Sequence, residues 1–166
     1  MSLFVSAAAA ALAVATCEKA FPEEGCGLLL GPVPENFDRP GRAVAVDEAR
    51  ALPNGWDASS KHNRYLIDPR HLVLIEAELE GTGRGVVGFF HSHPQVPAWP
   101  SPFDLAMSLP CCSYWIVRVQ DGKAVDSRSW QRTEDGRSFI EEDITQEGDN
   151  HEHRDQAADR LTGVRR

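Results

Sequence analysis

The sequence predicts an α/β fold, a mixed β-sheet with helices packed on it, and three observations support this prediction. Strand-like and helix-like segments alternate through the first two-thirds of the chain, whereas strands joined by turn dipeptides dominate the rest. The length of 166 residues suits one domain. An apolar share of 42% with 25% charged residues is ordinary for a soluble globular protein. We expect one domain over residues 1–145, followed by a polar, disordered tail over residues 146–166.

An apolar, Ala-rich segment runs from Ser2 to Ala15. A secretory signal would carry positive charge before such a stretch, but the first basic residue is Lys19. The segment is also too short to cross a bilayer. It therefore predicts a buried N-terminal helix that runs to about Ala20 and ends near Pro22.

Short strands and an irregular connection are predicted next. Gly27 to Gly31 is an apolar run between glycines, and Arg42 to Val46 alternates in polarity, so both are predicted strands. Ala51 to Asn63 contains a Pro-Asn-Gly turn sequence and is predicted to be irregular. Tyr65 to Ile67 is predicted to be a further short strand.

A helix is predicted after Asp68, because this carboxylate can cap the helix and Pro69 suits the first helical position. Apolar residues recur at helical spacing from Leu72 to Leu79 and form one face. Gly81 ends the predicted helix.

The rest of the chain is predicted to hold a buried strand, a short helix and a series of hairpin strands. Asp-Gly dipeptides at 121–122 and 135–136 predict tight turns between the last strands. The predicted strands are Gly85 to Phe90, Tyr114 to Val119, Ala124 to Trp130 and Ser138 to Ile144, and the helix is Pro102 to Leu109.

Two histidines, His91 and His93, follow the buried strand directly. Side chains alternate along a strand, so both imidazoles face one side and Ser92 faces the other. Two imidazoles on one face can converge on a metal ion. A second pair, His151 and His153, lies in a polar stretch without strand character, which favours a solvated surface.

Asp104 can supply the third protein ligand that a catalytic zinc site needs. It lies eleven residues beyond His93, after a loop that Pro94, Pro97 and Pro100 stiffen. The alternative is purely structural, because Ser101 and Asp104 also have the spacing of a helix capping box.

His91-Ser92-His93, seven residues, Ser101, two residues and Asp104 resembles the motif of the JAMM (MPN+) zinc metallopeptidases, His-[Ser/Thr]-His-x7-Ser-x2-Asp. Pro22-Glu23-Glu24-Gly25-Cys26-Gly27 resembles the segment before the first strand of bacterial members, and the resemblance covers roughly residues 10–130. It implies a single JAMM/MPN domain, with a curved mixed sheet layered as in cytidine deaminases.

The resemblance also implies a catalytic centre with one Zn²⁺ per chain. His91, His93 and Asp104 would be the ligands, Glu24 the acid and base, and Ser101 a helper of the oxyanion. Zinc lowers the pKa of a bound water to about 7, and a nearby carboxylate can carry its proton to the departing amine.

Several neighbouring residues leave alternatives open. Glu23 competes with Glu24, because spacing alone does not separate them. Cys26 lies close to Glu24, but a free cysteine is more often a small buried packing residue. Trp99 in the Pro-rich loop has the same packing interpretation, although it could also touch substrate.

The bacterial side of this family implies that the substrate is a ubiquitin-like sulfur carrier protein, cut at its C-terminal Gly-Gly. A deubiquitinase-like isopeptidase or small-peptide hydrolase is the alternative with the same chemistry. A non-catalytic MPN scaffold that binds a partner is a third hypothesis, but such members usually lack a ligand, and none is missing here.

Charge and cysteine content limit the partners and the compartment. The formal net charge is −8 and no basic stripe is present, so nucleic acid is a poor candidate partner. Two of the four cysteines are adjacent, which does not suggest a disulfide framework and favours a reducing cytoplasm. No segment predicts a membrane span.

Overall fold

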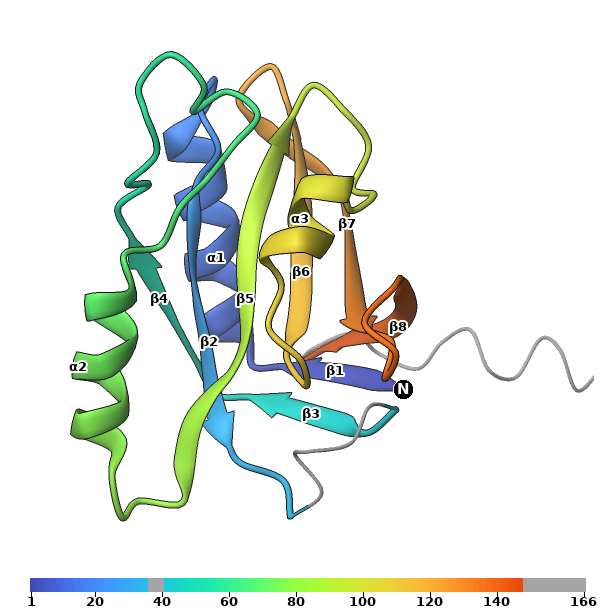
Figure 1. Cartoon of the computed structure of the whole chain (residues 1–166). Helices are drawn as coiled ribbons and strands as arrows, with labels where there is room; N and C mark the ends of the chain where they lie inside the picture. The colour runs from blue at the N-terminus through green and yellow to red at the C-terminus, as the bar shows by residue number, and fades with distance from the viewer. Residues whose placement is uncertain (36–40, 148–166) are drawn as a thin grey trace, which may run out of the picture.

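The computed structural model describes residues 1–35 and 41–147, and it confirms the predicted α/β class (Figure 1). The predicted tail beyond residue 147, with the second histidine pair, lies outside the described residues. Within the described part, one curved sheet of eight strands carries three helices. No helix in these ranges is long and apolar enough to cross a bilayer.

The eight strands are arranged in the order β3-β1-β8-β7-β6-β5-β2-β4. Their bounds are β1 Ser2–Val5, β2 Cys26–Pro32, β3 Ala43–Val46, β4 Glu48–Leu52, β5 Arg84–Pro94, β6 Ser113–Gln120, β7 Lys123–Arg132 and β8 Phe139–Gln146. The pairs β5–β6, β1–β3 and β1–β8 are parallel, and the other pairs are antiparallel. The sheet is therefore mixed, as predicted.

The two ends of the strand order approach each other, so the sheet is nearly closed. Asp47 alone separates β3 from β4, and its N–H donates to the carbonyl oxygen of Leu30 in β2. At Gly31 a Cβ atom would lie 2.0 Å from the carbonyl oxygen of Ala45, so only glycine allows this approach.

The N-terminal segment corrects one prediction, because Ser2–Val5 forms β1 and the helix α1 spans only Ala7–Ala20. Leu3 and Val5 are buried while Phe4 is exposed, the period-two pattern of a half-buried strand. Ser6 separates the two elements, and its hydroxyl caps α1 by accepting from the N–H of Ala9.

Two predictions in the middle of the chain were also wrong. β4 was missed, since its second half fell inside the segment predicted to be irregular. Tyr65 to Ile67 is not a strand. The Leu66 carbonyl accepts from Gly55 N–H and the Leu66 N–H donates to the Asn54 side chain, so these bonds go to a loop rather than to the sheet.

The other two helices form where they were predicted. α2 spans Pro69–Leu79, with Asp68 as its N-cap. α3 spans Pro102–Met107 and ends two residues earlier than predicted. The predicted turn at 121–122 joins β6 to β7, with positive φ at both residues.

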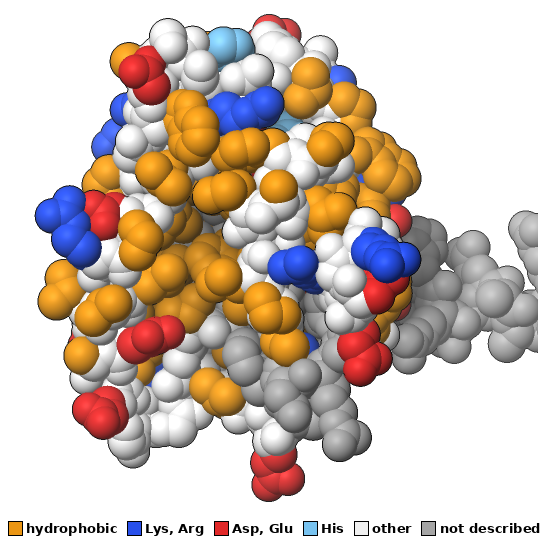
Figure 2. Space-filling view, in the orientation of Figure 1, with side chains coloured by type: hydrophobic (Ala, Val, Ile, Leu, Met, Phe, Trp, Pro, Cys, Tyr) orange, Lys and Arg blue, Asp and Glu red, His pale blue; other side chains and the backbone are white. Residues whose placement is uncertain are grey.

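The core divides between the two faces of the sheet. α1 covers one face and packs its small residues over side chains such as Leu29, Phe90 and Trp115. α2 covers part of the other face, over Leu28 and Phe89 among others. Figure 1 shows α1 behind the sheet and α3 in front of it, and Figure 2 shows hydrophobic side chains gathered on the front face. His91 and His93 lie on this second face, two and four residues beyond Phe89.

Candidate active site

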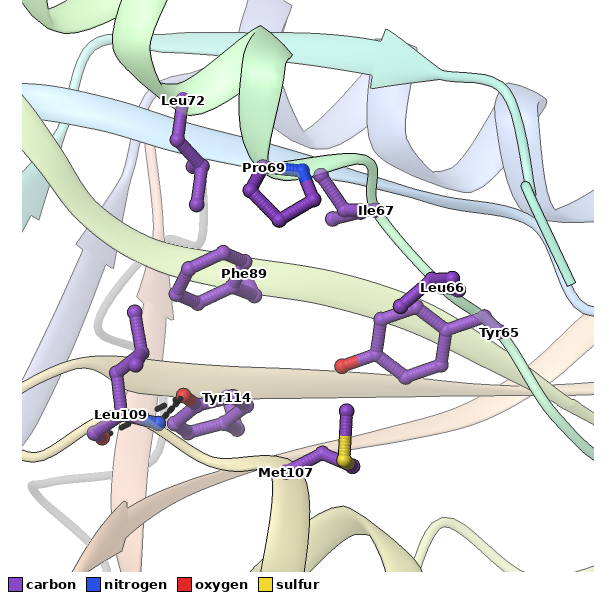
Figure 3. A pocket seen from close by; sticks show the side chains of 9 residues that line it. All are labelled: Tyr65, Leu66, Ile67, Pro69, Leu72, Phe89, Met107, Leu109 and Tyr114. Carbon is purple, nitrogen blue, oxygen red and sulfur yellow. Dashed lines mark hydrogen bonds between the residues drawn. The ribbon is translucent and has the colours of Figure 1, made fainter.

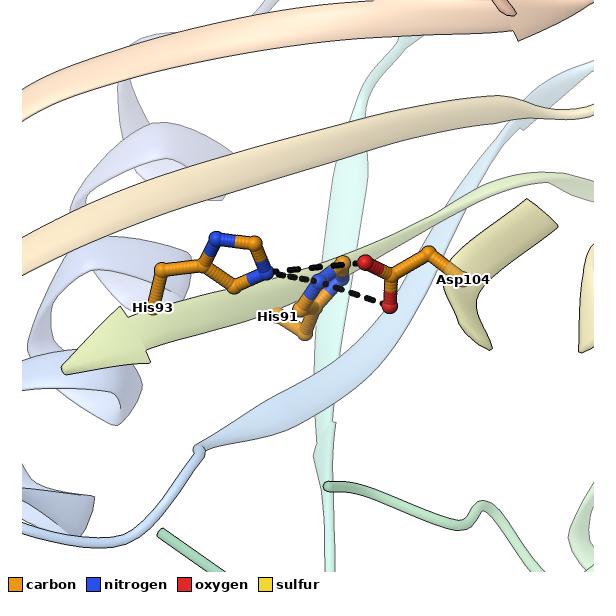
Figure 4. A group of neighbouring side chains, drawn as sticks. All are labelled: His91, His93 and Asp104. Atoms are coloured by element: carbon orange, nitrogen blue, oxygen red, sulfur yellow. Dashed lines mark hydrogen bonds and ion pairs between the residues drawn. The ribbon is translucent and has the colours of Figure 1, made fainter. Parts of the chain in front are cut away.

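Three buried side chains from β5 and α3 meet at one point. The Nε2 atoms of His91 and His93 lie 3.1 Å apart. Asp104 approaches them from α3, with Oδ1 3.4 Å from His91 Nε2 and Oδ2 3.6 Å from His93 Nε2 (Figure 4). All three residues are at least 93% shielded from solvent. The structure thus brings together the three predicted ligands.

These separations fit a tetrahedral zinc site. Ligand atoms about 2.0–2.1 Å from zinc at tetrahedral angles lie about 3.3 Å from one another. The three separations of 3.1, 3.4 and 3.6 Å scatter around that value. Two imidazoles and one carboxylate leave a fourth position for water or substrate, the donor set of a catalytic zinc rather than a structural one.

The protonation states also suit a cation. The carbonyl oxygen of Pro97 lies 2.9 Å from Nδ1 of His93, and a carbonyl can only accept, so Nδ1 carries a hydrogen and Nε2 is the nitrogen that faces Asp104. Burial lowers the pKa of His93, but its hydrogen bonds to Asp104 and Pro97 outweigh burial and raise it, so a metal ion would compete with a proton for Nε2. Burial lowers the pKa of His91 to about 3, which keeps this imidazole neutral. Burial raises the pKa of Asp104, but hydrogen bonds and the histidines outweigh it and hold the carboxyl ionised.

Ser101 and Asp104 do form the capping box that was the structural alternative. The Ser101 N–H donates to Oδ2 of Asp104 at 2.6 Å, and the Ser101 hydroxyl accepts from the Asp104 N–H at 3.1 Å. Because Oδ1 faces His91 and is not used by the cap, capping and metal binding are compatible. The hydroxyl hydrogen of Ser101 is not needed by the cap and remains available as a donor.

Glu24 is buried and close enough to His93 and Asp104 to be affected by their charges, whereas Glu23 is exposed to solvent. Cys26 pairs with His91, so continuing the antiparallel register by two residues places Glu24 opposite His93. Burial raises the pKa of Glu24 to about 8, and Asp104 adds to this, while His93 and Arg64 oppose it. The geometry therefore separates the two glutamates that spacing alone left equal.

Ser92 has a structural role that the sequence analysis did not predict. Its hydroxyl accepts from the Gly25 N–H at 2.8 Å, and its own N–H donates to the Gly25 carbonyl at 2.9 Å. Ser92 is fully buried on the face opposite the histidines. The middle residue of the His-Ser-His sequence therefore ties β5 to the residue that follows Glu24.

Asn54 was also missed, because its Pro-Asn-Gly context was interpreted only as a turn. Its Nδ2 donates to the carbonyl oxygens of Glu24 at 3.0 Å and of Arg64 at 2.9 Å. Its Oδ1 accepts from the N–H groups of Trp56 and Leu66. One side chain thus joins the two ends of the loop over residues 54–66 to the main chain of Glu24.

An apolar cavity of about 180 Å³ lies on the same face as the site. Tyr65 connects the two, because its ring stacks on the His91 imidazole with centroids 4.5 Å apart and also lines the cavity (Figure 3). Phe89, Tyr114 and Met107 form other parts of the wall. An apolar cavity of this size next to the three converging side chains can hold one apolar group of a ligand.

The buried cysteines of the described residues are packing residues. Cys17, Cys26 and Cys112 are buried, and burial raises the pKa of each thiol to about 12. Such thiols carry almost no thiolate near neutral pH and are poor nucleophiles or ligands. Trp99 is exposed and packs on Trp130, whose Nε1–H donates to the Ala98 carbonyl in the Pro-rich loop.

Comparison with known sequences gives one family match and several relatives. The family of prokaryotic homologs of the JAB domain matches residues 6–133. A CysO-cysteine peptidase of Mycobacterium tuberculosis is 28% identical over 119 residues, which cover 71% of this chain and 74% of that protein. A desampylase of Haloferax volcanii is 35% identical over 83 residues, about half of each chain.

Comparison with solved structures gives a match in fold over most of the chain. The solution structure of a protein from Desulfitobacterium hafniense matches with a TM-score of 0.69 and 27% identity. The match covers 91% of this chain and 97% of that one. The likeness therefore extends over nearly the whole fold and is not limited to the His-Ser-His segment.

Proposed function

Because the chain belongs to the family of prokaryotic homologs of the JAB domain, we propose that it is a zinc-dependent peptidase that cuts an amide bond at the C-terminal Gly-Gly of a ubiquitin-like sulfur carrier protein. The observation that supports this most is the convergence of His91, His93 and Asp104 with a buried carboxylate, Glu24, beside them. One Zn²⁺ per chain fits this donor set.

The proposed reaction is the hydrolysis of an amide. Zinc in this site would polarise the scissile carbonyl and lower the pKa of a bound water to about 7. Glu24 takes a proton from the attacking water and gives it to the departing amine, as general base and then general acid. The hydroxyl of Ser101 donates to the oxyanion that develops on the carbonyl oxygen.

The names of the relatives support the substrate class. The Mycobacterium tuberculosis relative is named a CysO-cysteine peptidase, and the Haloferax relative is named a desampylase. Glycine has no side chain, so an extended tail that ends in two glycines can bring its backbone close to the buried centre. An apolar residue farther up the tail would occupy the cavity beside Tyr65.

Mass spectrometry tests the proposal directly. The zinc-loaded protein is incubated with candidate sulfur carriers that bear an extra residue after Gly-Gly, and the products are weighed. We expect loss of the residues after the second glycine, and no loss with Glu24→Gln. Carriers that stay intact with the wild-type protein would remove this function.

An isopeptidase acting on protein conjugates is the second candidate. The desampylase name favours it, and the zinc chemistry is the same. Faster release of a lysine-linked carrier than of a terminal amino acid would favour the isopeptidase. A scaffold without catalysis is opposed by the complete ligand set, and only absence of zinc binding at pH 7 would revive it.

A further inference from the structure

The segment before Tyr65 is attached directly to Glu24. The Glu24 N–H donates to the carbonyl oxygen of Lys61 at 2.7 Å. The Asn54 amide joins the carbonyl oxygens of Glu24 and Arg64, which fixes the main chain of Arg64 relative to Glu24. The main chain that carries the Arg64 side chain is therefore held at a fixed position relative to Glu24, the proposed acid.

The side chain of Arg64 is fixed at its other end as well. Its guanidinium carbon lies 4.6 Å from the centroid of Phe103, the residue before Asp104. Trp56 packs edge-on against the same ring at 5.2 Å. Arg64 thus extends from the Glu24 side of the site to the Asp104 side, with its cation held against an aromatic face.

The guanidinium has donors to spare. Among residues 1–35 and 41–147, its one hydrogen bond goes to the Asn63 carbonyl at 2.6 Å, and no carboxylate forms an ion pair with it. Arg50, Arg70, Arg84 and Arg128 each pair with acidic side chains. A half-buried arginine without an acidic partner, in a chain of net charge −8, is available to bind an anion.

The influence of Arg64 reaches the catalytic carboxylate, since its positive charge lowers the pKa of Glu24. The cation therefore acts on Glu24, and it packs against Phe103, the residue before Asp104.

We infer that Arg64 is a specificity-determining residue that binds the α-carboxylate of a single amino acid released from the substrate's C-terminus. The inference rests on the proposed function and specifies its leaving group. Glu24 delivers a proton to the departing amine, so groups beside Glu24 face the leaving side. In a terminal amino acid the carboxylate is bonded to the same carbon as that amine. A guanidinium on the leaving side can therefore pair with it.

The same geometry disfavours a lysine-linked conjugate. There the departing amine ends a chain of methylene groups, and no carboxylate lies next to it. Arg64 would gain no partner, and its desolvation on binding would not be offset. The structure thus favours trimming of a terminal residue over separation of two proteins.

A pair of synthetic peptides ending in Gly-Gly-Ala, one as the free acid and one as the carboxamide, tests the inference. We expect the zinc-loaded wild type to cleave the acid about 10- to 100-fold more efficiently in kcat/KM, the range that a charged hydrogen-bonded pair supplies. Arg64→Gln should remove this preference by slowing cleavage of the acid alone, and Arg64→Lys should retain part of it.

Arg84→Gln is the matched control, because Arg84 lies at the opposite end of β5 from the histidines and its loss removes the same charge. It should keep the full preference. Equal cleavage of acid and amide by the wild type, or equal loss of both in Arg64→Gln, would overturn the inference while leaving the proposed function intact.

Calorimetry provides a measurement that does not depend on turnover. Binding of both peptides to zinc-loaded Glu24→Gln should favour the acid, and an added Arg64→Gln change should abolish the difference. If the wild type cleaves neither peptide, the proposed function fails, and calorimetry still decides on Arg64. Equal affinity for acid and amide would refute it.

Discussion

Replacing Ser92 by alanine should separate the positioning of Glu24 from the binding of zinc. The Ser92 hydroxyl accepts the Gly25 N–H at 2.8 Å in a fully buried environment, and it faces away from His91 and His93. Alanine removes the acceptor but leaves the backbone bond from Ser92 N–H to the Gly25 carbonyl. The residue that follows Glu24 thus loses one of its two bonds to β5.

The size of the effect follows from that single bond. A buried N–H left without an acceptor costs about 1–3 kcal/mol of folding free energy. For a domain of this size, this corresponds to a fall in melting temperature of about 2–12 °C. A displacement of Glu24 near 1 Å would lower kcat by up to about 100-fold, because proton transfer depends on position. Zinc affinity should not change.

Three measurements on purified Ser92→Ala test this reasoning: thermal melting, zinc affinity by chelator competition, and kcat on a Gly-Gly peptide. Ser92→Thr is the control, since it keeps the hydroxyl and threonine occurs at this position of the JAMM motif. It should stay close to wild type in all three. An Ala variant with normal kcat, or one that loses zinc, would show that this bond does not position Glu24.

Three further variants test the site. Glu24→Gln should keep one zinc per chain and lose about 10²- to 10⁴-fold in kcat, the usual contribution of a general acid and base; metal analysis beside a rate assay checks this, and an active variant would require another base. Asp104→Ala should lose zinc, because only two ligands remain, and it also removes the acceptor of the Ser101 N–H; stoichiometric zinc in that variant would contradict the ligand assignment. Asn54→Ala should lower the free energy of unfolding in urea by about 2–4 kcal/mol, since four main-chain groups lose their partner. An unfolding free energy within error of wild type would show that the loop does not depend on Asn54.

The meeting of His91, His93 and Asp104 could be predicted, because local rules place each residue and the resemblance to the family motif joins them. Strand periodicity puts His91 and His93 on one face, and the capping box fixes Asp104 at the start of α3. The choice between Glu23 and Glu24 could not be made from spacing, since it depends on how β2 pairs with β5. That pairing joins residues far apart in the sequence.

Contacts within the loop that precedes α2 could not be predicted at all. Asn54 and Arg64 gain their importance from hydrogen bonds to Glu24 and from packing on Phe103, and no local periodicity encodes either contact. The apolar sequence of Tyr65 to Ile67 does resemble a strand, but its residues line a cavity instead. Similarly, β1 was hidden because an Ala-rich helix follows it after one residue.

The position of β1 between β3 and β8 has a consequence for biosynthesis. Ser2 pairs with Ala43 on one side and with Asp143 on the other, so the second pairing spans nearly the whole domain. A ribosome adds about 5–20 residues per second, so the nascent β1 waits several seconds for β8 to emerge. During that interval its edge toward β8 is open to other chains, and a ribosome stalled before residue 139 would leave it open until the chain is released or degraded.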